Sequence, residues 1–344
     1  RIEVLKGSQS SLYGNSAVGG TINIFTKKGR IGKHQNTSIR TGEHNTQDIF
    51  YSIDGADTNY NYFLGFNYYS TDGISAMKND NSENDPYKNK SLTANHSYKI
   101  SEKNIIENYL TLKDSYLKYD EPTNGRDDTL NSSDNIEVHY NLKFKNSNNN
   151  FKNTFGLNKS ATSRMVTKHT SRQATYEGFK NMFTYLGEYN FNLDSRIIYG
   201  SDTEFFKAKY PTDPGVVKTH DEEIHSQYID YQFRPAENIY ATIGGRNDKH
   251  TSSGDEQSYR VTGSYGLGGN SKIRMSYGTG FLFPAIYESG EYGWSNQDGD
   301  KITAEKTTSF DIGYETYFEN LNIAFDITYF DILVEDPIMG SNIT

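Results

Sequence analysis

Residues 1–29 of the chain read RIEVLKGSQSSLYGNSAVGGTINIFTKKG, and this stretch decides how the rest of the sequence is interpreted. Ile2 and Val4 lie on one face of a short alternating stretch that a Lys-Gly pair ends, which predicts a strand and a turn. The serine-rich residues that follow fit one tight helical turn with a serine cap. The Gly19-Gly20 pair then lets two backbones approach closely or adopt a positive φ, before a second alternating stretch. The sequence therefore predicts a compact, glycine-rich segment ahead of everything else.

Strict alternation of apolar and polar side chains begins after this segment and recurs through the rest of the chain. In residues 60–68 one face is aromatic or aliphatic and the other is mainly small or polar. The two faces are Tyr60, Tyr62, Leu64, Phe66 and Tyr68 against Asn61, Phe63, Gly65 and Asn67. Residues 310–318 and 321–329 follow the same rule. Alternation of this length is a strand signal, so we predict roughly 14 or 15 strands between residues 38 and 334.

Two kinds of connection separate these predicted strands. Tight turns are expected at residues 55–57, 146–150, 192–194, 235–237, 268–270 and 319–320. Long polar loops are expected at residues 72–89, 120–134, 162–175, 209–221 and 281–306. Long and short connections alternate along most of the chain, which is typical of a transmembrane β-barrel with short periplasmic turns and long extracellular loops. A β-sandwich does not predict this asymmetry.

The composition supports an all-β transmembrane barrel and excludes several other classes. Only 34% of the residues are hydrophobic but 14% are aromatic, whereas disordered chains are poor in aromatic residues. The chain contains no run of about 18 apolar residues, so the sequence predicts no transmembrane helix. The absence of cysteine removes disulfides and thiolate metal sites, and the net charge of -9 argues against a nucleic-acid partner. The histidines show no metal-ligand spacing and no nucleophile motif is present, so no enzyme activity and no organic cofactor are predicted.

Residues 1–29 resemble the end of the plug domain of TonB-dependent outer-membrane receptors. Members of that family usually show a run similar to R-I-E-V-x-R-G-P-x-S-x-x-Y-G-x-x-A-x-G-G-x-I-N-I-x-T. The matching positions that we assign to the plug motif are Arg1, Glu3, Gly7, Tyr13, Gly14, Gly19, Gly20 and Asn23. Two departures are Lys6, where arginine is usual, and Ser8, where proline is usual. Lysine keeps the charge and serine is able to cap a helical turn, so neither change is expected to disturb the geometry.

A second resemblance lies far along the chain. The residues SYGTGF at 276–281, with the proline and glutamate that follow, are similar to the family's S-x-G-x-G-F-x-x-P-x-x-x-E segment. Residues 302–313 are similar to its L-x-P-E-x-S-x-x-x-E-x-G segment, with Ala304 in place of proline and Asp311 in place of glutamate. The resemblance therefore spans most of the chain, in the family's order and spacing.

This resemblance implies both a fold and a function. It implies that residues 1–30 are the C-terminal part of a plug domain and that residues 31–344 are a partial barrel, with about 14–15 of an expected 22 strands. Both termini then look truncated, and a coupling peptide is expected before Arg1. The implied activity is energy-coupled uptake of vitamin B12 (cobalamin) or a ferric siderophore across the bacterial outer membrane. The implied partners are a TonB-type inner-membrane energy complex and the lipid of the outer membrane.

Two other classes stay open on the sequence. A passive porin-like or structural outer-membrane barrel would share the strand pattern, but it would lack the glycine-rich segment. A soluble secreted β-protein such as an adhesin would carry similar numbers of polar residues on both strand faces. The aromatic faces of the predicted strands disagree with that third class.

Charge pairing is expected to anchor the plug, because an unpaired ion buried in the lumen is costly. Arg1 and Lys6 are the candidates on the plug side. On the barrel side, Glu188 alternates with aromatic side chains, and Asp202 and Glu204 share one face of the next strand. The sequence predicts that one or more of these acids pairs with the plug. The alternative is that they are ordinary lumen-facing polar residues.

Three long loops carry candidates for ligand and metal binding. Aromatic candidates for contact with the transported ligand, in residues 281–306, are Tyr287, Tyr292 and Trp294. Acidic candidates for a structural calcium ion, which takes about six to eight oxygen ligands, are Asp80, Glu83, Asp85, Asp120 and Asp128. The sequences GISA at 73–76 and ENDPYKN at 83–89 also resemble the cobalamin-receptor branch, whose members can order these loops with calcium. Acidic, asparagine-rich loops are equally the ordinary composition of solvated loops.

Overall fold

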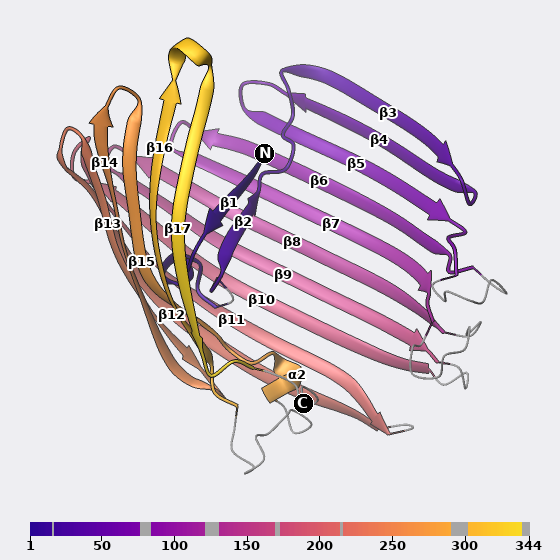
Figure 1. Cartoon of the computed structure of the whole chain (residues 1–344). Coiled ribbons are helices and arrows are strands. Elements are labelled where there is room, and N and C mark those ends of the chain that lie inside the picture. The colour runs from indigo at the N-terminus through magenta and orange to yellow at the C-terminus, as the bar shows by residue number, and fades with distance from the viewer. Residues whose placement is uncertain are drawn as a thin grey trace.

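The computed structural model describes residues 1–15, 17–75, 84–120, 131–168, 173–213, 216–289 and 302–338 (Figure 1). Within this part of the chain there are two sheets, one of two strands near the N-terminus and one of 15 strands. No helix among the described residues is long and apolar enough to cross a membrane. The prediction of an all-β fold is confirmed.

The elements of the small sheet come first along the chain: β1 (Ile2–Lys6), α1 (Ser10–Tyr13) and β2 (Gly20–Ile24). The strands of the large sheet are β3 (Gly32–Gly42), β4 (Thr46–Ala56), β5 (Tyr60–Thr71), β6 (Tyr87–Ser101), β7 (Asn104–Lys118), β8 (Ser132–Asn148), β9 (Phe151–Thr167), β10 (Gln173–Asn190), β11 (Ser195–Asp213), β12 (Val216–Ala236), β13 (Ile239–His250), β14 (Gly254–Gly268), β15 (Ser271–Leu282), β16 (Glu305–Phe318) and β17 (Ile323–Glu335). Two helical turns, α2 (Ile286–Ser289) and η2 (Glu319–Leu321), lie between the last strands.

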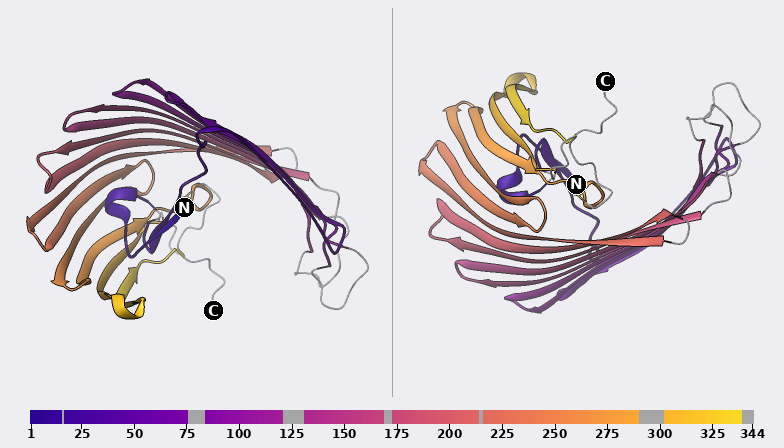
Figure 2. Two further views of the ribbon diagram at one scale, coloured as in Figure 1. Left: turned by 90° about the horizontal axis from the view of Figure 1, so that it is seen from above. Right: turned by 90° about the horizontal axis from the view of Figure 1, so that it is seen from below.

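Each strand of the large sheet pairs antiparallel with its neighbours in sequence, from β3 at one edge to β17 at the other. The sheet forms a curved wall that is open on one side, and the small sheet lies inside the curve (Figure 2). In β5, Leu64 and Phe66 are 43% and 42% exposed, whereas Phe63 on the opposite face is 8% exposed. Asn61 shares the face of Phe63 and bonds to Gly29 inside the curve. The aromatic face is therefore the convex one, where a transmembrane barrel meets lipid.

The two ends of the sheet differ in the length of their connections. Within the described residues one end carries only tight turns, at residues 57–59, 102–103, 149–150, 191–194, 237–238, 269–270 and 319–322. Asn149, Asn270 and Asn322 have positive φ angles of 44°, 64° and 52°, which asparagine tolerates in such turns. The strand ends that border the long connections, at residues 72–86, 119–131 and 283–304, all lie at the opposite end. By the rule for transmembrane barrels, the tight turns mark the periplasmic end.

Two of the predicted long loops are wrong. The hairpins β9–β10 and β11–β12 extend into residues 162–175 and 209–221, so strand replaces most of each expected loop. Above the lipid neither face of a strand has to be apolar, so the hydrophobic alternation disappears although the strands stay paired. Charges on neighbouring strands support this extension, for example Lys207 with Asp221 at 3.3 Å. A polar stretch is therefore not by itself a sign of a loop in this chain.

Candidate functional site

The glycine-rich segment, residues 1–30, starts with a β1–β2 hairpin in which Lys6 pairs with Gly20. Gly20 has a φ of 148°, and a Cβ at this position would stand 2.4 Å from the carbonyl oxygen of Leu5. No side chain fits there, so glycine is required for the close approach of the two strands. The predicted order of strand, turn, helical turn and second strand is confirmed.

The helical turn α1 is capped differently from the prediction. Its N-cap residue is Gln9, and no side chain hydrogen-bonds to the cap. The sequence predicts Ser8 or Ser10 as the cap, but Ser10 is the first residue of the helical turn itself, and the hydroxyl of Ser8 donates to the carbonyl oxygen of Thr279 on β15 at 2.7 Å. The side-chain amide of Gln9 donates through Nε2 to the carbonyl oxygen of Lys6 at 3.1 Å. The predicted serine cap is wrong because Ser8 bonds to the large sheet.

Four hydrogen bonds within the described residues attach this segment to the inner face of β12–β16 and to Phe283, which directly follows β15; together we call these the docking wall. They run from Ser8 N to Ser309 Oγ (3.1 Å), from Ser8 Oγ to the Thr279 carbonyl (2.7 Å), from Arg260 Nη1 to Gln9 Oε1 (2.6 Å) and from Phe283 N to Asn15 Oδ1 (2.8 Å). None of the four joins two ions. The segment is thus held by polar contacts in which the side supplied by the segment is always neutral.

Two glycines bring the segment close to the docking wall. Gly14 has a φ of 75° and lies against β13, where a Cβ would stand 2.7 Å from Nη2 of Arg246. On the other side of the contact, a Cβ at Gly280 of β15 would stand 2.4 Å from Oγ of Ser8. Neither position has room for a methyl group. The contact therefore depends on glycine on both of its sides.

Arg246 is held by two carboxylates of the large sheet, independently of the glycine-rich segment. Its side chain is 2% exposed, with Nε 2.9 Å from Asp248 Oδ2 and Nη1 3.2 Å from Asp202 Oδ2. The ring of Tyr228 lies 5.1 Å from the guanidinium carbon, which is within the range of a cation–π interaction. A buried ion that loses its partner destabilises a protein strongly. These contacts therefore set a rigid surface against which Gly14 lies.

The predicted pairing of Arg1 and Lys6 with acids of the barrel does not form. Arg1 pairs with Glu3 of its own hairpin at 2.9 Å, and within the described residues Lys6 makes no ion pair. The three acids bond to cations of the large sheet: Glu188 to Lys152 and Arg196, Asp202 to Arg246, and Glu204 to Lys180. The physical reason is register, because neighbouring strands bring a cation within reach of each acid. The structure has the reverse arrangement, in which Arg246 and Arg260 of the docking wall face a neutral segment, and no local sequence signal marks it.

The last residues of the segment are attached to the opposite side of the curve. Arg30 forms a two-pronged ion pair with Asp54 of β4, with Nη2 to Oδ1 at 2.8 Å and Nε to Oδ2 at 3.0 Å. The side-chain amide of Asn61 both accepts from and donates to the backbone of Gly29, at 2.8 Å and 2.7 Å. The glycine-rich segment therefore crosses the space inside the curve, with its head on β12–β16 and its end on β4–β5.

A buried cluster at the long-loop end of the docking wall was not singled out by the sequence. Glu222 is 4% exposed and accepts hydrogen bonds from the hydroxyls of Ser252, at 2.7 Å, and of Ser289. Nδ1 of His250 accepts from the backbone N–H of Ser252 at 3.2 Å, so the ring proton lies on Nε2, which is 3.5 Å from Glu222. Because Ser289 belongs to α2, this cluster ties the start of the long connection after β15 to the wall.

The remaining predicted site residues are only partly described. Tyr292, Trp294, Asp80, Glu83 and Asp128 lie outside the described residues, and Tyr287 lies in α2. Asp85 and Asp120 flank the paired ends of β6 and β7, where Lys118 N donates to the Pro86 carbonyl at 3.1 Å. Among the described residues there is no group of three or more His, Asp or Glu side chains placed to hold a metal ion. The ligand and calcium sites stay predictions.

Comparisons with known proteins agree on one architecture. Residues 32–344 match the family described as "TonB dependent receptor-like, beta-barrel". The chain is similar to the vitamin B12 transporter BtuB of Vibrio vulnificus (strain CMCP6), with 21% identity over 350 residues, covering 98% of this chain and 55% of that protein. The chain thus spans little more than half the length of this curated relative.

Solved structures show the same fold at low sequence identity. The siderophore receptor PirA from Acinetobacter baumannii gives a TM-score of 0.78 at 15% identity, covering 98% of this chain and 57% of that one. A variant of the ferric enterobactin receptor PfeA from Pseudomonas aeruginosa gives 0.80 at 16% identity, covering 97% and 58%. The ferripyoverdine receptor of the same organism gives 0.79 at 13% identity, covering 96% and 52%.

Proposed function

Because this chain belongs to the TonB-dependent receptor family, whose members are integral proteins of the bacterial outer membrane, we propose that it acts in energy-coupled uptake of a scarce ligand. The ligand that we propose is vitamin B12 or a ferric siderophore, since the similar proteins include a transporter of the first and receptors for the second. The proposed partner is a TonB-type complex of the inner membrane. We propose residues 1–30 as plug and residues 31–344 as barrel.

The observation that supports this proposal is the position of the glycine-rich segment inside the curve of the large sheet (Figure 2). A passive pore needs an open lumen, whereas this segment is hydrogen-bonded across the lumen to both sides of the wall. A gated transporter needs a block that stays in place at rest and moves when energy is supplied. The hydrogen bonds of the segment to both sides of the curve support a block that stays in place at rest. Their modest strength supports a block that moves when energy is supplied.

The contacts of the segment suit reversible release. The three hydrogen bonds between neutral groups contribute on the order of 0.5–1.5 kcal/mol net each, and the one that charged Arg260 donates contributes on the order of 1.5–3 kcal/mol, so water replaces them at modest cost. Arg246 keeps Asp202 and Asp248 when Gly14 moves away, so no buried ion is left without a partner. We propose that energy transmitted through the plug detaches the segment from the docking wall and opens a path for the ligand.

The proposal is tested by uptake in a strain that lacks the full-length receptor and is complemented with it. Labelled vitamin B12 and labelled ferric siderophores are supplied in turn, with the energy complex intact or deleted. We expect saturable uptake of one ligand class, which is lost when the energy complex is absent. Uptake that continues without the energy complex, for many unrelated solutes, would support the passive porin-like alternative instead.

A structural calcium ion in the long loops is a second, independent proposal. Asp85 and Asp120 supply carboxylates where two long connections leave β6 and β7, and calcium takes about six to eight such oxygens. The thermal midpoint of the purified receptor is compared in calcium and in a chelator. We expect a rise in calcium that Asp85→Asn and Asp120→Asn abolish, and equal midpoints in both solutions would contradict the proposal.

A further inference from the structure

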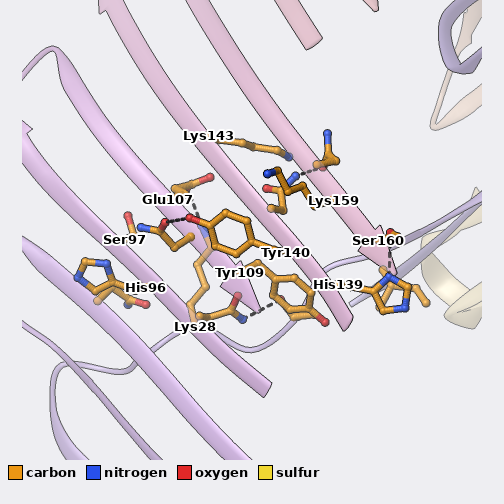
Figure 3. A pocket seen from close by; sticks show the side chains of 17 residues that line it. Lys28, His96, Ser97, Glu107, Tyr109, His139, Tyr140, Lys143, Lys159 and Ser160 are labelled. Atoms are coloured by element: carbon orange, nitrogen blue, oxygen red, sulfur yellow. Dashed lines mark hydrogen bonds and ion pairs between the residues drawn. The ribbon is translucent and has the colours of Figure 1, made fainter. Parts of the chain in front are cut away.

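A cavity of about 560 Å³ lies away from the docking wall, between residues 24–28 of the glycine-rich segment and the inner face of β6–β9 (Figure 3). We call this inner face the basic wall. Lys28 reaches the cavity from the segment, while Glu107 and Lys143 reach it from β7 and β8. The pair His139 and Ser160 lies toward its other end.

The cation excess around Glu107 is the first feature of this cavity. Nζ of Lys145 lies 2.7 Å from Glu107 and Nζ of Lys28 lies 3.6 Å from it. Lys143 stands directly across from Glu107 in the β7–β8 register, and within the described residues it makes no ion pair. Three ammonium groups therefore surround one carboxylate. Within the described residues Glu107 is the one acid that these three lysines share, so two positive charges are left without an acidic partner there.

The excess extends over the basic wall. Strand register places the inward cations at Lys99, Lys113, Lys143, Lys145, Lys152 and Arg164, and the inward acids at Glu107 and Glu137. Glu137 is already bound by Lys113 at 3.0 Å. Cations that share a concave surface raise the local concentration of anions. The basic wall therefore attracts negatively charged solutes into the cavity, whereas the docking wall holds its arginines between acids.

Neutral hydrogen-bonding groups complete the cavity. The side-chain amides of Asn141 and Asn158 bond to each other across β8 and β9, and Oγ of Ser160 lies 3.0 Å from Nδ1 of His139. Amide and hydroxyl donors beside a lysine are the groups that bind the oxygens of carboxylates and phosphates, because charge-assisted hydrogen bonds are stronger than neutral ones. Lys143 and these donors face the same space from adjacent strands.

We propose that this cavity is an oxyanion subsite, which binds a carboxylate or phosphate group of the transported ligand beside the glycine-rich segment. The subsite deepens the proposed function, on which it rests, by naming the chemistry of the ligand. Lys143 is the principal cation, and Asn141, Asn158 and Ser160 bind the oxygens. Glu107 holds Lys28 and Lys145 and competes with the ligand for their charge.

The test is equilibrium binding of inorganic phosphate and of citrate to the purified full-length receptor in detergent, measured by calorimetry. Lys143→Gln is expected to weaken binding of at least one probe about 3- to 10-fold, as the loss of one charge near an anion predicts. Glu107→Gln is expected to tighten binding about 3-fold, because it removes the competing carboxylate. A misfolded variant would not bind more tightly, so this second variant guards against a folding artefact. The two probes distinguish a phosphate subsite from a carboxylate subsite.

The matched control is Lys152→Gln, because Lys152 lies on the same wall but is bound to Glu188 at 2.9 Å and does not line the cavity. Its affinity for both probes is expected to stay within about 2-fold of the original. Unchanged binding in Lys143→Gln, or an equal loss in Lys152→Gln, would overturn the subsite. Because binding is measured without the energy complex, failure here leaves the uptake proposal standing, and failure of uptake leaves the subsite standing.

Discussion

The docking wall of β12–β16 and the basic wall of β6–β9 are built by the same alternation of residues, but they treat the space inside the curve differently. The docking wall buries Arg246 between two carboxylates and meets the glycine-rich segment at glycines. The basic wall carries lysines in excess and leaves a cavity of about 560 Å³ beside residues 24–28. A surface whose buried cations are already paired with its own carboxylates is suited to holding a neutral segment and to releasing it. Uncompensated charge makes a surface fit to bind a solute.

The largest expected effect comes from breaking charge compensation in the docking wall. Arg246→Met leaves Asp202 and Asp248 buried without their cation, which should destabilise the receptor by about 3–5 kcal/mol. The measurement is the midpoint of denaturant unfolding. Arg196→Met is the matched control, because Arg196 lies 3.8 Å from Glu188 with its side chain 45% exposed, and its loss should cost at most about 1 kcal/mol. Equal effects of the two variants would remove the distinction between a buried and an exposed pair.

A smaller effect is expected where the segment touches that wall. Gly14→Ala places a methyl group 2.7 Å from Arg246 at a φ of 75°, so strain of roughly 1–2 kcal/mol should loosen the segment. Amide hydrogen exchange in residues 8–14 should then become about 5- to 30-fold faster. Gly19→Ala is the control, because no atom lies within 4 Å of its Cβ position and exchange should not change. Equal exchange in both variants would show that Gly14 does not need its close approach.

A single hydrogen bond gives a still smaller change. Ser8→Ala removes the hydrogen bond to the Thr279 carbonyl but keeps the bond from Ser8 N to Ser309. The free energy that attaches the segment to the docking wall should therefore fall by about 0.5–1.5 kcal/mol. The readout is protease cleavage of the segment in the folded receptor, which should speed up. Ser11→Ala lies on the same helical turn and makes no hydrogen bond to the wall within the described residues. If Ser11→Ala speeds cleavage as much as Ser8→Ala does, the hydrogen bond of Ser8 does not specifically stabilise the attached segment.

The smallest stability effect is expected on the basic wall. Lys143→Gln should change the free energy of unfolding by less than about 0.5 kcal/mol, because Lys143 makes no ion pair within the described residues. The same denaturant titration that is used for Arg246→Met measures it. A loss of several kcal/mol would mean that Lys143 supports the fold, and that the two walls do not differ as described.

The sequence was sufficient for the fold because period-2 alternation and glycine spacing are local signals. Residues 60–68 showed both faces of β5, and residues 1–29 showed the hairpin and its helical turn. The loop predicted at residues 209–221 failed because polar strands above the lipid lose the apolar alternation but keep their ladder. The apolar alternation reports a lipid-facing side of a strand, and there is no such side above the lipid, although single side chains such as Tyr210 are buried there.

The site was less predictable because it depends on partners that are far apart in the chain. Arg246 and Gly14 meet only after the sheet curves, and no local spacing joins them. The expected pairing of Arg1 with Asp202 followed from charge sign alone, whereas register gave Asp202 to Arg246. No local pattern marks Glu222, although His250 and the start of the long connection enclose it. The pairing register of the strands and the curvature of the sheet decide these contacts, and neither can be read from a single sequence.

The central claim is that the glycine-rich segment must leave the docking wall for the ligand to pass. In the full-length receptor, with any cysteine outside residues 1–344 replaced by serine, Ser8→Cys with Ser309→Cys introduces a disulfide across the contact in which Ser8 N lies 3.1 Å from Ser309 Oγ, since residues 1–344 contain no cysteine. Uptake of the transported ligand is measured with the pair oxidised, and again after reduction, with each single-cysteine variant as a control. We expect uptake to stop in the oxidised double variant and to return on reduction. Full uptake with the disulfide completely formed would contradict it.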